Sequence, residues 1–415
     1  MPKTTPFHQR TDALNQTRIW KNWSGYLVAP QYQYSISTEY YSIRNSVSLL
    51  DTSPLFKYRF SGSDSVALLR HALARDVGKC KIGHAQYNVW CDEKGFVVQD
   101  GVIMRVDENE FLLTAAEPAL RYFRQIARTK GLNASTVQDV SEAYGILALQ
   151  GPHTHNVISK LTDAATPLGY FQIAQTELQN RPVTISRTGY TGDLGYEIWI
   201  RSEDAIAVWD AITEAGADYN LTPVGTTALK MARVEAGLLL MDVDFESSRF
   251  AWVDAQRETP IELGFGWMFR NLQDDKRDFI GREAIEVEIS RQTNRWTTVG
   301  LAIDWHDYER VHFKAGISPP KYELYREETM SLYRRGEAEW DYAGYASSFL
   351  FSSLLKKPIA IAKLPIDLAT PGTEVDLELS VIKKPVNVLA RVTDMPFFNP
   401  DRKTAMFPKT RQGDA

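Results

Sequence analysis

The chain has 415 residues, of which 44% are hydrophobic and 24% charged, a composition typical of a globular protein with two or three domains. Its formal net charge of −5 and the lack of a long basic run argue against nucleic acid as a partner. No stretch of ~20 apolar residues occurs and the N-terminus is polar, so we expect no membrane span, no membrane partner and no signal peptide, and place the protein in the cytoplasm.

Residues 1–40 are polar and rich in aromatic side chains, and we interpret them as an N-terminal arm. Beyond them, apolar residues recur at helical spacing in some segments and at strand spacing in others. The helical patterns cover 63–74, 117–131, 203–216 and 226–237, and the strand patterns cover 95–107, 110–116, 144–151, 182–192 and 196–200. Because the two kinds do not alternate strictly, we predict an α+β fold in which antiparallel sheets are covered by helices.

From about residue 295 onward, strand patterns are separated by proline and glycine turns. The clearest strand patterns are WTTVGLAID, KKPIAIAKL, TEVDLELSVI and VNVLARVTD. They predict a compact C-terminal β domain. Within it, the charged segment 321–341 is expected to form a solvated helix or a hairpin insertion.

Metal and disulfide chemistry find little support in the sequence. Cys80 and Cys91 are too few for a disulfide framework and do not form a zinc-type pair, so we expect two reduced thiols. His153 and His155 would lie on one face of a strand, but no third ligand is evident and no metal site is predicted.

Asp100 is the first candidate for a reacting group. It stands in GFVVQDG (95–101), where a carboxylate interrupts a run of strand-forming apolar residues. Burying its charge is costly without a partner, so the position indicates either a functional acid or an acid that marks a turn beside Gly101. Gln86-Tyr87-Asn88 precedes this run.

The second candidate is the glycine-rich segment RTGYTGDLGYE (187–197). Its glycines permit tight backbone geometry close to a ligand, although the pattern is not that of a dinucleotide-binding loop. Glu197 follows in a strand pattern, where a carboxylate is suited to accept paired hydrogen bonds from a flat N–H edge such as that of a pteridine. The alternative is a turn followed by an edge strand with a solvated glutamate.

Two further segments carry weaker signals. Arg233 lies in RVEAG (233–237), near the end of an apolar helix, where the helix dipole alone favours a cation. Trp267 lies in GFGW (264–267), where glycines present an aromatic face and core packing is the default.

The order and spacing of these segments resemble those of a known family. The matching segments, spread over roughly residues 40–405, are LLDTSPLFKYRFSG (49–62), AQYNVW, GFVVQDG, LALQGP (147–152), RTGYTGDLGYEIW (187–199), RVEAGL (233–238), ELGFGW (262–267), DFIGREA (278–284), GYASS (344–348) and PFFNPDRKTA (396–405). They resemble the glycine-cleavage T-protein (aminomethyltransferase) family, which includes the folate domains of dimethylglycine oxidase and sarcosine dehydrogenase and tetrahydrofolate-dependent O- and S-demethylases. GYTGDLGYE and RVEAG are the more specific motifs.

The resemblance implies a cloverleaf-like folate-binding body and a C-terminal β-barrel domain, with tetrahydrofolate as the cofactor. The implied divisions are an arm over 1–40, folate-binding domains over 41–290, the barrel domain over 291–405 and a tail over 406–415.

Residue by residue, the resemblance assigns roles to six side chains. Asp100 matches the family's acid near folate N5, and Tyr87 matches the tyrosine that lines the same pocket, so both are expected to be catalytic and to contact folate. Tyr190 and Glu197 match the pterin-contacting pair. Arg233 matches the arginine near the acid or the folate, and Trp267 matches an aromatic residue along the p-aminobenzoate path. Tyr87, His84 and Tyr190 are candidates for a proton donor to a leaving group.

Several segments depart from the T-protein pattern, among them Asp51–Lys57, the long stretch after RVEAG and an insertion at 306–322. Because the folate-facing residues survive while these segments differ, we expect an altered donor. The main hypothesis is C1 transfer to tetrahydrofolate from a small O-, S- or N-methylated molecule. The alternatives are aminomethyl transfer from a lipoyl carrier protein and a non-catalytic folate-binding factor.

Overall fold

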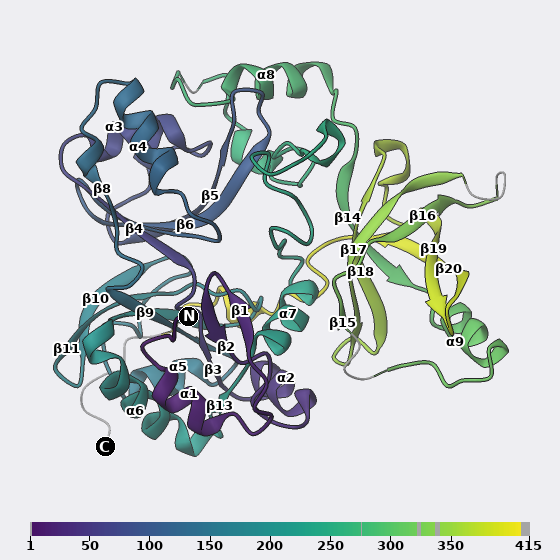
Figure 1. Ribbon diagram of the computed structural model, residues 1–415, viewed down its shortest axis with the longest axis horizontal. Helices are drawn as coiled ribbons and strands as arrows, with labels where there is room; N and C mark the ends of the chain where they lie inside the picture. The colour runs from purple at the N-terminus through teal and green to yellow at the C-terminus, as the bar shows by residue number, and fades with distance from the viewer. Residues whose placement is uncertain (1, 275, 322–324, 337–340, 408–415) are drawn as a thin grey trace.

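The protein, described by a computed structural model over residues 2–274, 276–321, 325–336 and 341–407, has three lobes (Figure 1). Two lobes, each built on a sheet, lie one above the other at the left of the figure, and a barrel forms the third lobe at the right. Of the predicted tail 406–415, residues 408–415 lie outside the described residues. Within the described part of the chain, no helix is both long and apolar enough to cross a membrane.

The first lobe is built on a six-stranded sheet in the order β10-β11-β12-β9-β3-β13. Its strands are β3 (Ser48–Asp51), β9 (Tyr144–Gln150), β10 (Ile173–Leu178), β11 (Arg181–Ser186), β12 (Gly195–Arg201) and β13 (Thr222–Pro223). The helices of this lobe are α1 (His8–Leu14), α2 (Ile36–Asn45), α5 (Thr154–Ser159), α6 (Ala205–Gly216) and α7 (Thr226–Glu235). Neighbouring strands are antiparallel except β3 and β13. Alternate residues such as Leu147, Ile198 and Ile200 form one core with Val157 and Trp209 of the helices.

Part of the predicted N-terminal arm belongs to this lobe. Phe7 is fully buried in the first-lobe core, and Arg10 of α1 binds Asp210 of α6 through two hydrogen bonds of 2.7 and 2.6 Å. The hairpin β1 (Lys21–Trp23) and β2 (Tyr26–Val28) follows α1. The predicted boundary at residue 40 falls inside α2.

The second lobe is built on a five-stranded antiparallel sheet in the order β5-β6-β7-β4-β8. Its strands are β4 (Phe56–Ser61), β5 (His84–Cys91), β6 (Val97–Asp107), β7 (Glu110–Ala115) and β8 (Val137–Asp139). One face is covered by α3 (Ser65–Ala72) and α4 (Leu120–Thr129), where Trp90, Ile103 and Phe111 pack against Leu68 and Phe123. Cys80 and Cys91 are buried free thiols.

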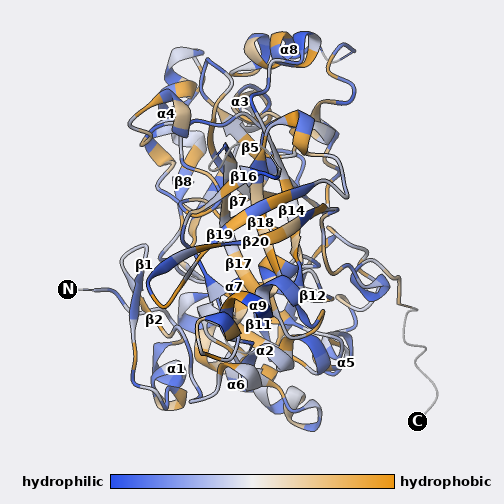
Figure 2. Ribbon diagram, turned by 90° about the vertical axis from the view of Figure 1, so that its right-hand side faces the viewer, coloured by the Kyte–Doolittle hydropathy of each residue, from blue (hydrophilic) through white to orange (hydrophobic). Residues whose placement is uncertain are grey.

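The third lobe, reached through α8 (Arg282–Arg291), is a closed six-stranded barrel. Its strands are β14 (Thr297–Ile303), β16 (Met330–Arg334), β17 (Tyr342–Ser352), β18 (Lys357–Leu364), β19 (Glu374–Val381) and β20 (Lys384–Thr393), and pairing of β17 with β18 completes the closure. The barrel faces the viewer in Figure 2, where orange marks hydrophobic residues and blue marks hydrophilic ones. The predicted α+β fold with a C-terminal β-barrel is therefore confirmed.

Two local predictions were wrong in part. The described residues of the segment 321–341 form no helix: β15 (Tyr325–Arg326) pairs with β17, and β16, with buried Met330 and Leu332, forms an antiparallel hairpin with β17, so the hairpin alternative is correct. This hairpin is not a solvated insertion, because β16 is a strand of the barrel. Residues 322–324 and 337–340 of this segment lie outside the described residues. The strand predicted over 182–192 ends at Ser186, where a turn begins.

The insertion at 306–322 contains most of α9 (Trp305–Lys314), whose Tyr308 and Val311 pack on the barrel core.

A buried ionic cluster at the end of α7 joins the first lobe to the barrel and to the C-terminal segment. Glu235 accepts hydrogen bonds from Arg44 of α2, 2.9 Å away, and from Ser352 of β17 in the barrel, 2.5 Å away. Arg44 also lies 3.6 Å from Asp193, which Arg402 of the C-terminal segment binds at 2.6 and 2.7 Å. The carboxylates of Glu235 and Asp193 and the guanidinium of Arg44 have no exposed side-chain surface. Each charge is therefore neutralised only by the others.

We expect Glu235→Ala to destabilise the protein by about 3–5 kcal/mol, because it leaves the buried Arg44 without its main counter-charge. Urea unfolding followed by tryptophan fluorescence measures the change. Glu286→Ala is the matched control, since Glu286 also binds an arginine but has a 42% exposed side chain, and it should change stability by less than about 0.5 kcal/mol. Equal effects of the two substitutions would contradict the assigned role of the cluster.

Candidate functional site

The candidate site lies where the first-lobe sheet faces the second-lobe sheet. In the second lobe, register places Tyr87 opposite Val102 and Asp100 opposite Val89, so all four share the face that α3 and α4 leave uncovered. In the first lobe, Glu197 pairs with Ala148 and shares its face with Trp199, whereas Ile198 faces the helices.

Apolar contacts show that these two faces meet. Trp199, Ile146 and Ile173 of the first lobe form one cluster with Ala85, Met104 and Leu112 of the second lobe, with Val102 packed against it. On the other side, Val89 shares a second cluster with Leu50 and Ala148. Asp100 lies opposite Val89 of the second cluster and two residues before Val102 of the first. Glu197 lies opposite Ala148 of the second cluster and two residues before Trp199 of the first. The two carboxylates therefore lie on opposing sheets, between the two clusters.

Solvent reaches this interface although its surroundings are buried. Tyr87, Asp100, Tyr190 and Glu197 each keep partial exposure, and Glu197 is the one residue of 191–200 that is not fully buried. The four residues therefore keep some exposed surface in otherwise buried surroundings.

Asp100 and Tyr87 form a hydrogen-bonded pair across β5 and β6. The Tyr87 hydroxyl donates to Asp100 Oδ2 at 2.8 Å. Burial raises the pKa of Asp100 from 3.8 to about 6, and the hydrogen bond from Tyr87 opposes this rise. Burial and the charge of Asp100 raise the pKa of Tyr87, which therefore stays a neutral phenol. The pair can thus hold either a carboxylate or a carboxylic acid close to neutral pH.

Two aromatic residues flank this pair. The ring of Phe265 meets the Tyr87 ring edge to face, with centroids 5.4 Å apart. Tyr190 packs against the cluster that contains Val89, and its hydroxyl donates to the main-chain oxygen of Leu239. Burial raises the pKa of Tyr190, and the charge of Asp100 raises it further, so the tyrosine is a neutral side chain near the acid.

The two carboxylate oxygens of Glu197 differ, because within the described part of the chain one accepts a hydrogen bond from the protein and the other does not. Thr188 donates its hydroxyl to Glu197 Oε2, and Ser186 lies within 2.7 Å of the Thr188 hydroxyl. Among the described residues, no hydrogen bond reaches Oε1. Burial raises the pKa of Glu197, and the Thr188 hydrogen bond opposes this effect. A flat N–H edge would therefore find a partly dehydrated carboxylate oxygen to bind.

The glycines of 187–197 make room for protein atoms rather than for a ligand. A Cβ on Gly189 would lie 2.1 Å from Oε1 of Gln150, and one on Gly195 would lie 2.3 Å from the same side chain. Gln150 donates to the main-chain oxygens of Thr188 and Tyr196 and accepts from the Thr191 hydroxyl. The turn is thus wrapped around one buried glutamine, which the sequence did not reveal because its role depends on long-range contact.

The other predicted site residues lie at the margin of this interface. Arg233 has 0% exposure and is engaged by Asp244, by Ser348 at 2.7 Å and by Tyr325 at 3.2 Å. Trp267, 40% exposed, lies beneath the guanidinium of Arg75, whose central carbon is 5.2 Å from its ring. His84 contacts Gln172 at 3.3 Å, at the start of β5. Sequence patterns did not single out Arg75, which stands in no distinctive motif, and they gave no role to Thr188, although it lies in the segment 187–197.

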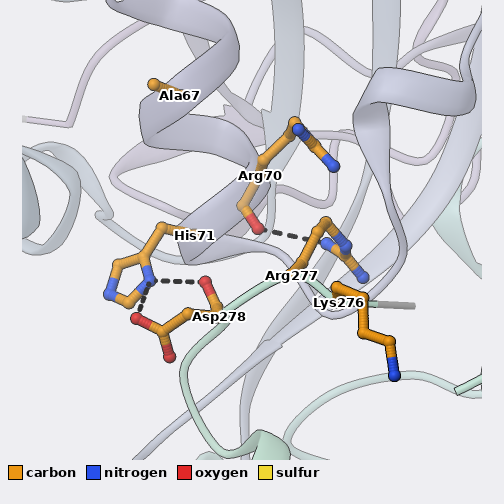
Figure 3. A pocket seen from close by; sticks show the side chains of 6 residues that line it. All are labelled: Ala67, Arg70, His71, Lys276, Arg277 and Asp278. Carbon is orange, nitrogen blue, oxygen red and sulfur yellow. Dashed lines mark hydrogen bonds and ion pairs between the residues drawn. The ribbon is translucent and has the colours of Figure 1, made fainter. Parts of the chain in front are cut away.

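A separate cavity of about 330 Å³ opens beside the end of α3 and is lined by Ala67, Arg70, His71, Lys276, Arg277 and Asp278 (Figure 3). Arg277 donates to the main-chain oxygen of Arg70, and His71 contacts the main-chain oxygen of Asp278. The charged groups that line it are thus largely engaged with one another and with the backbone. Among the described residues, no group of three or more His, Cys, Asp or Glu could hold a metal ion.

The three lobes have the fold of the folate-dependent one-carbon transferases. The family model "GCVT N-terminal domain" matches residues 7–271, and the chain belongs to this family, whose members bind tetrahydrofolate. The resemblance noted in the sequence is thus confirmed.

Three curated relatives cover most of this chain. The aminomethyltransferase of Saccharopolyspora erythraea is 27% identical over 96% of this chain and 98% of its own length. The heme-dependent oxidative N-demethylase gamma subunit of Ectopseudomonas mendocina is 28% identical over 92% and 93%. The trimethylamine-oxide aldolase of Ruegeria pomeroyi is 32% identical over 91% of this chain but only 45% of its own length.

A solved structure supports the fold. The glycine cleavage system aminomethyltransferase T from Bartonella henselae superimposes with a TM-score of 0.78, covering 98% of this chain and 100% of that one at 23% sequence identity.

The raised pKa of Asp100 predicts that this acid destabilises the folded protein above about pH 6. Between about pH 4 and 6 the folded state holds a proton that the unfolded chain releases, so the contribution of Asp100 to stability falls as the pH rises through this window. We expect Asp100→Asn to be more stable than the wild type at pH 7, by on the order of 2–3 kcal/mol, and nearly equal to it at pH 4. Unfolding in urea at both pH values measures this difference. A constant difference at the two pH values would contradict the raised pKa.

Proposed function

We propose that this protein transfers a one-carbon group to N5 of tetrahydrofolate bound between the two facing sheets. The observation that carries the proposal is the Tyr87–Asp100 pair facing Glu197 across a largely buried interface. When bound, the reduced folate supplies a nucleophilic nitrogen that accepts the carbon.

Glu197 is the proposed clamp for the pterin ring. Thr188 fixes one carboxylate oxygen by its hydrogen bond, so the other is held in one direction and can accept from the pterin N–H edge. Tyr190 is proposed to pack against the ring, because it is neutral and partly accessible. Arg233 is proposed to act on folate indirectly, since its bonds to Asp244 and Ser348 hold the segment that follows α7, and Tyr190 donates into this segment at Leu239.

Asp100 is the proposed reacting acid. A fixed carboxylate beside N5 stabilises positive charge that develops there during transfer, and it can hold the proton that N5 releases. Tyr87 orients the carboxylate through its 2.8 Å hydrogen bond and is itself a neutral donor for a leaving group. Phe265 and Trp267 are proposed to lie along the p-aminobenzoate portion of folate, because Phe265 packs on Tyr87 and Trp267 is partly exposed nearby.

The relatives favour an aminomethyl donor. Besides the relative from Saccharopolyspora erythraea, five further relatives of similar coverage are named aminomethyltransferase, so transfer from a lipoyl carrier protein becomes the first candidate rather than the demethylation preferred on sequence grounds. The second candidate is demethylation of a small methylated molecule, which the names of the N-demethylase subunit and the trimethylamine-oxide aldolase favour.

The donor is identified by mass spectrometry of the folate product. The protein is incubated with tetrahydrofolate and either an aminomethyl-loaded lipoyl carrier or one member of a panel of O-, S- and N-methylated molecules. Methylene-tetrahydrofolate with release of ammonia supports the first candidate, and a folate product with a panel member supports the second. Tight folate binding without turnover on any donor would instead indicate a non-catalytic folate-binding factor.

We expect Glu197→Gln to weaken tetrahydrofolate binding about 10- to 100-fold, because a hydrogen bond to a charged acceptor is worth about 1.5–3 kcal/mol. Isothermal titration calorimetry measures the affinity. Glu177→Gln on the exposed side of β10 is the matched control and should bind folate like the wild type. Unchanged affinity in Glu197→Gln would remove this residue from the clamp.

We expect Asp100→Asn to bind folate with little change but to lower turnover at least ~100-fold, the usual scale for a positioned acid or electrostatic group. Wild-type turnover should rise through about pH 6 as the carboxylate ionises, and this limb should be absent from the residual activity of the variant. Steady-state rates between pH 5 and 8 test both statements. Turnover near the wild-type level would exclude Asp100 from the chemistry.

A further inference from the structure

Arg75 is a cation held rigidly at the edge of the candidate site. Its main-chain N–H donates to Asn88 Oδ1 at 2.9 Å, and its carbonyl accepts from Asn88 Nδ2 at 2.9 Å. Its guanidinium donates to the main-chain oxygen of Tyr87 at 3.3 Å and lies over the ring of Trp267. The backbone is thus fixed by one buried asparagine, and the charge is placed between two proposed site residues.

This guanidinium has little to balance its charge. Among the described residues no carboxylate forms an ion pair with Arg75, and burial lowers its pKa. Arg187 is also partly desolvated and without a carboxylate, but its terminal nitrogens donate to four main-chain oxygens, those of Leu168, Arg402, Lys403 and Ala405. Arg75 has one such acceptor. A guanidinium carries five N–H donors, so most of those on Arg75 remain available to a ligand.

Arg75 is linked through Tyr87 to the Tyr87–Asp100 pair. The residue whose carbonyl accepts from Arg75 is Tyr87, and the hydroxyl of the same residue donates to Asp100. Phe265 packs on the Tyr87 ring, and Trp267, two residues later, packs under Arg75. A ligand that extends from Asp100 along these aromatic residues therefore arrives at Arg75.

We propose that Arg75 binds a carboxylate on a ligand of the candidate site, with Trp267 fixing the plane of the guanidinium. A planar fork of donors matches a carboxylate in a bidentate geometry. One guanidinium balances the single charge of a carboxylate in full, whereas it would leave half the charge of a phosphate dianion uncompensated. Two molecules could present this carboxylate, namely folate through its glutamyl end and the C1 donor. The proposal rests on the proposed function.

The folate source is tested by calorimetry with two stable probes, 5-formyltetrahydrofolate and the N-methylamide of 5-formyltetrahydropteroic acid, which has neither the glutamyl group nor a free carboxylate. Binding of the amide probe to the wild type tests folate binding itself and does not involve the proposed carboxylate. We expect Arg75→Gln to bind 5-formyltetrahydrofolate about 10- to 100-fold more weakly and to bind the amide probe as the wild type does. Arg75→Lys, which keeps the charge without the planar fork, should lie between the two. Arg121→Gln, an exposed arginine of α4, is the control.

The donor source is tested on protein saturated with the N-methylamide of 5-formyltetrahydropteroic acid, which has no carboxylate, by titration with acetate, benzoate and N,N-dimethylglycine. Wild-type binding of one of these carboxylates that is lost in Arg75→Gln supports the donor as the source. The proposal is overturned if Arg75→Gln matches the wild type in both titrations, or if the wild type binds no carboxylate in either. Failure of the wild type to bind either folate probe would instead refute the proposed function. Melting temperatures of all variants confirm that they remain folded.

Discussion

The architecture depends on charges buried at the end of one helix. Arg233 and Glu235 lie two residues apart on α7 and bind different partners. Arg233 binds Asp244 and the barrel residue Ser348. Glu235 binds Arg44 and the barrel residue Ser352. Buried ion pairs are poor sources of stability compared with apolar packing, but they tolerate little misalignment because any lost partner leaves an uncompensated charge. In this protein they fix the position of the barrel on the first lobe, and with it the segment after α7 that receives the Tyr190 hydroxyl.

In the candidate site, unlike in the ionic cluster, largely buried polar groups have few hydrogen-bond partners. Asp100 has one side-chain partner in Tyr87, and Glu197 has one in Thr188, although both lie in largely apolar surroundings. Such groups raise the free energy of the folded protein, and perturbed carboxylates of this kind concentrate at functional sites. The contrast with Arg233 is informative. All three side chains were assigned to folate from motifs alone, but only the two carboxylates keep surface that a ligand could touch.

The sequence predicted the fold class and most elements, because the periodicity of β6, β9, α6 and α7 reflects local burial that each segment shows by itself. Asp100 and Glu197 stood out as candidates because a charge inside an apolar strand is conspicuous, and the family resemblance supplied the roles expected of them. It failed where the outcome depends on distant contacts. The charged segment around Met330 became a barrel strand because β17 and β19 offer it pairing on both sides. Gln150 and Arg75 escaped notice because only tertiary structure brings the glycine turn around one and Trp267 beside the other.

The path of the chain after the barrel has a consequence for how the barrel can move. Beyond β20 the chain returns to the first lobe, where Arg187 holds the carbonyls of Arg402, Lys403 and Ala405, and Asp193 holds the Arg402 side chain. The chain enters the barrel after α8, and the segment that leaves the barrel is bound to the glycine turn of the first lobe. A hinge that swung it outward would have to break the same turn that carries the pterin clamp. The position of the barrel and the conformation of the segment 187–197 are thus coupled through the returning chain.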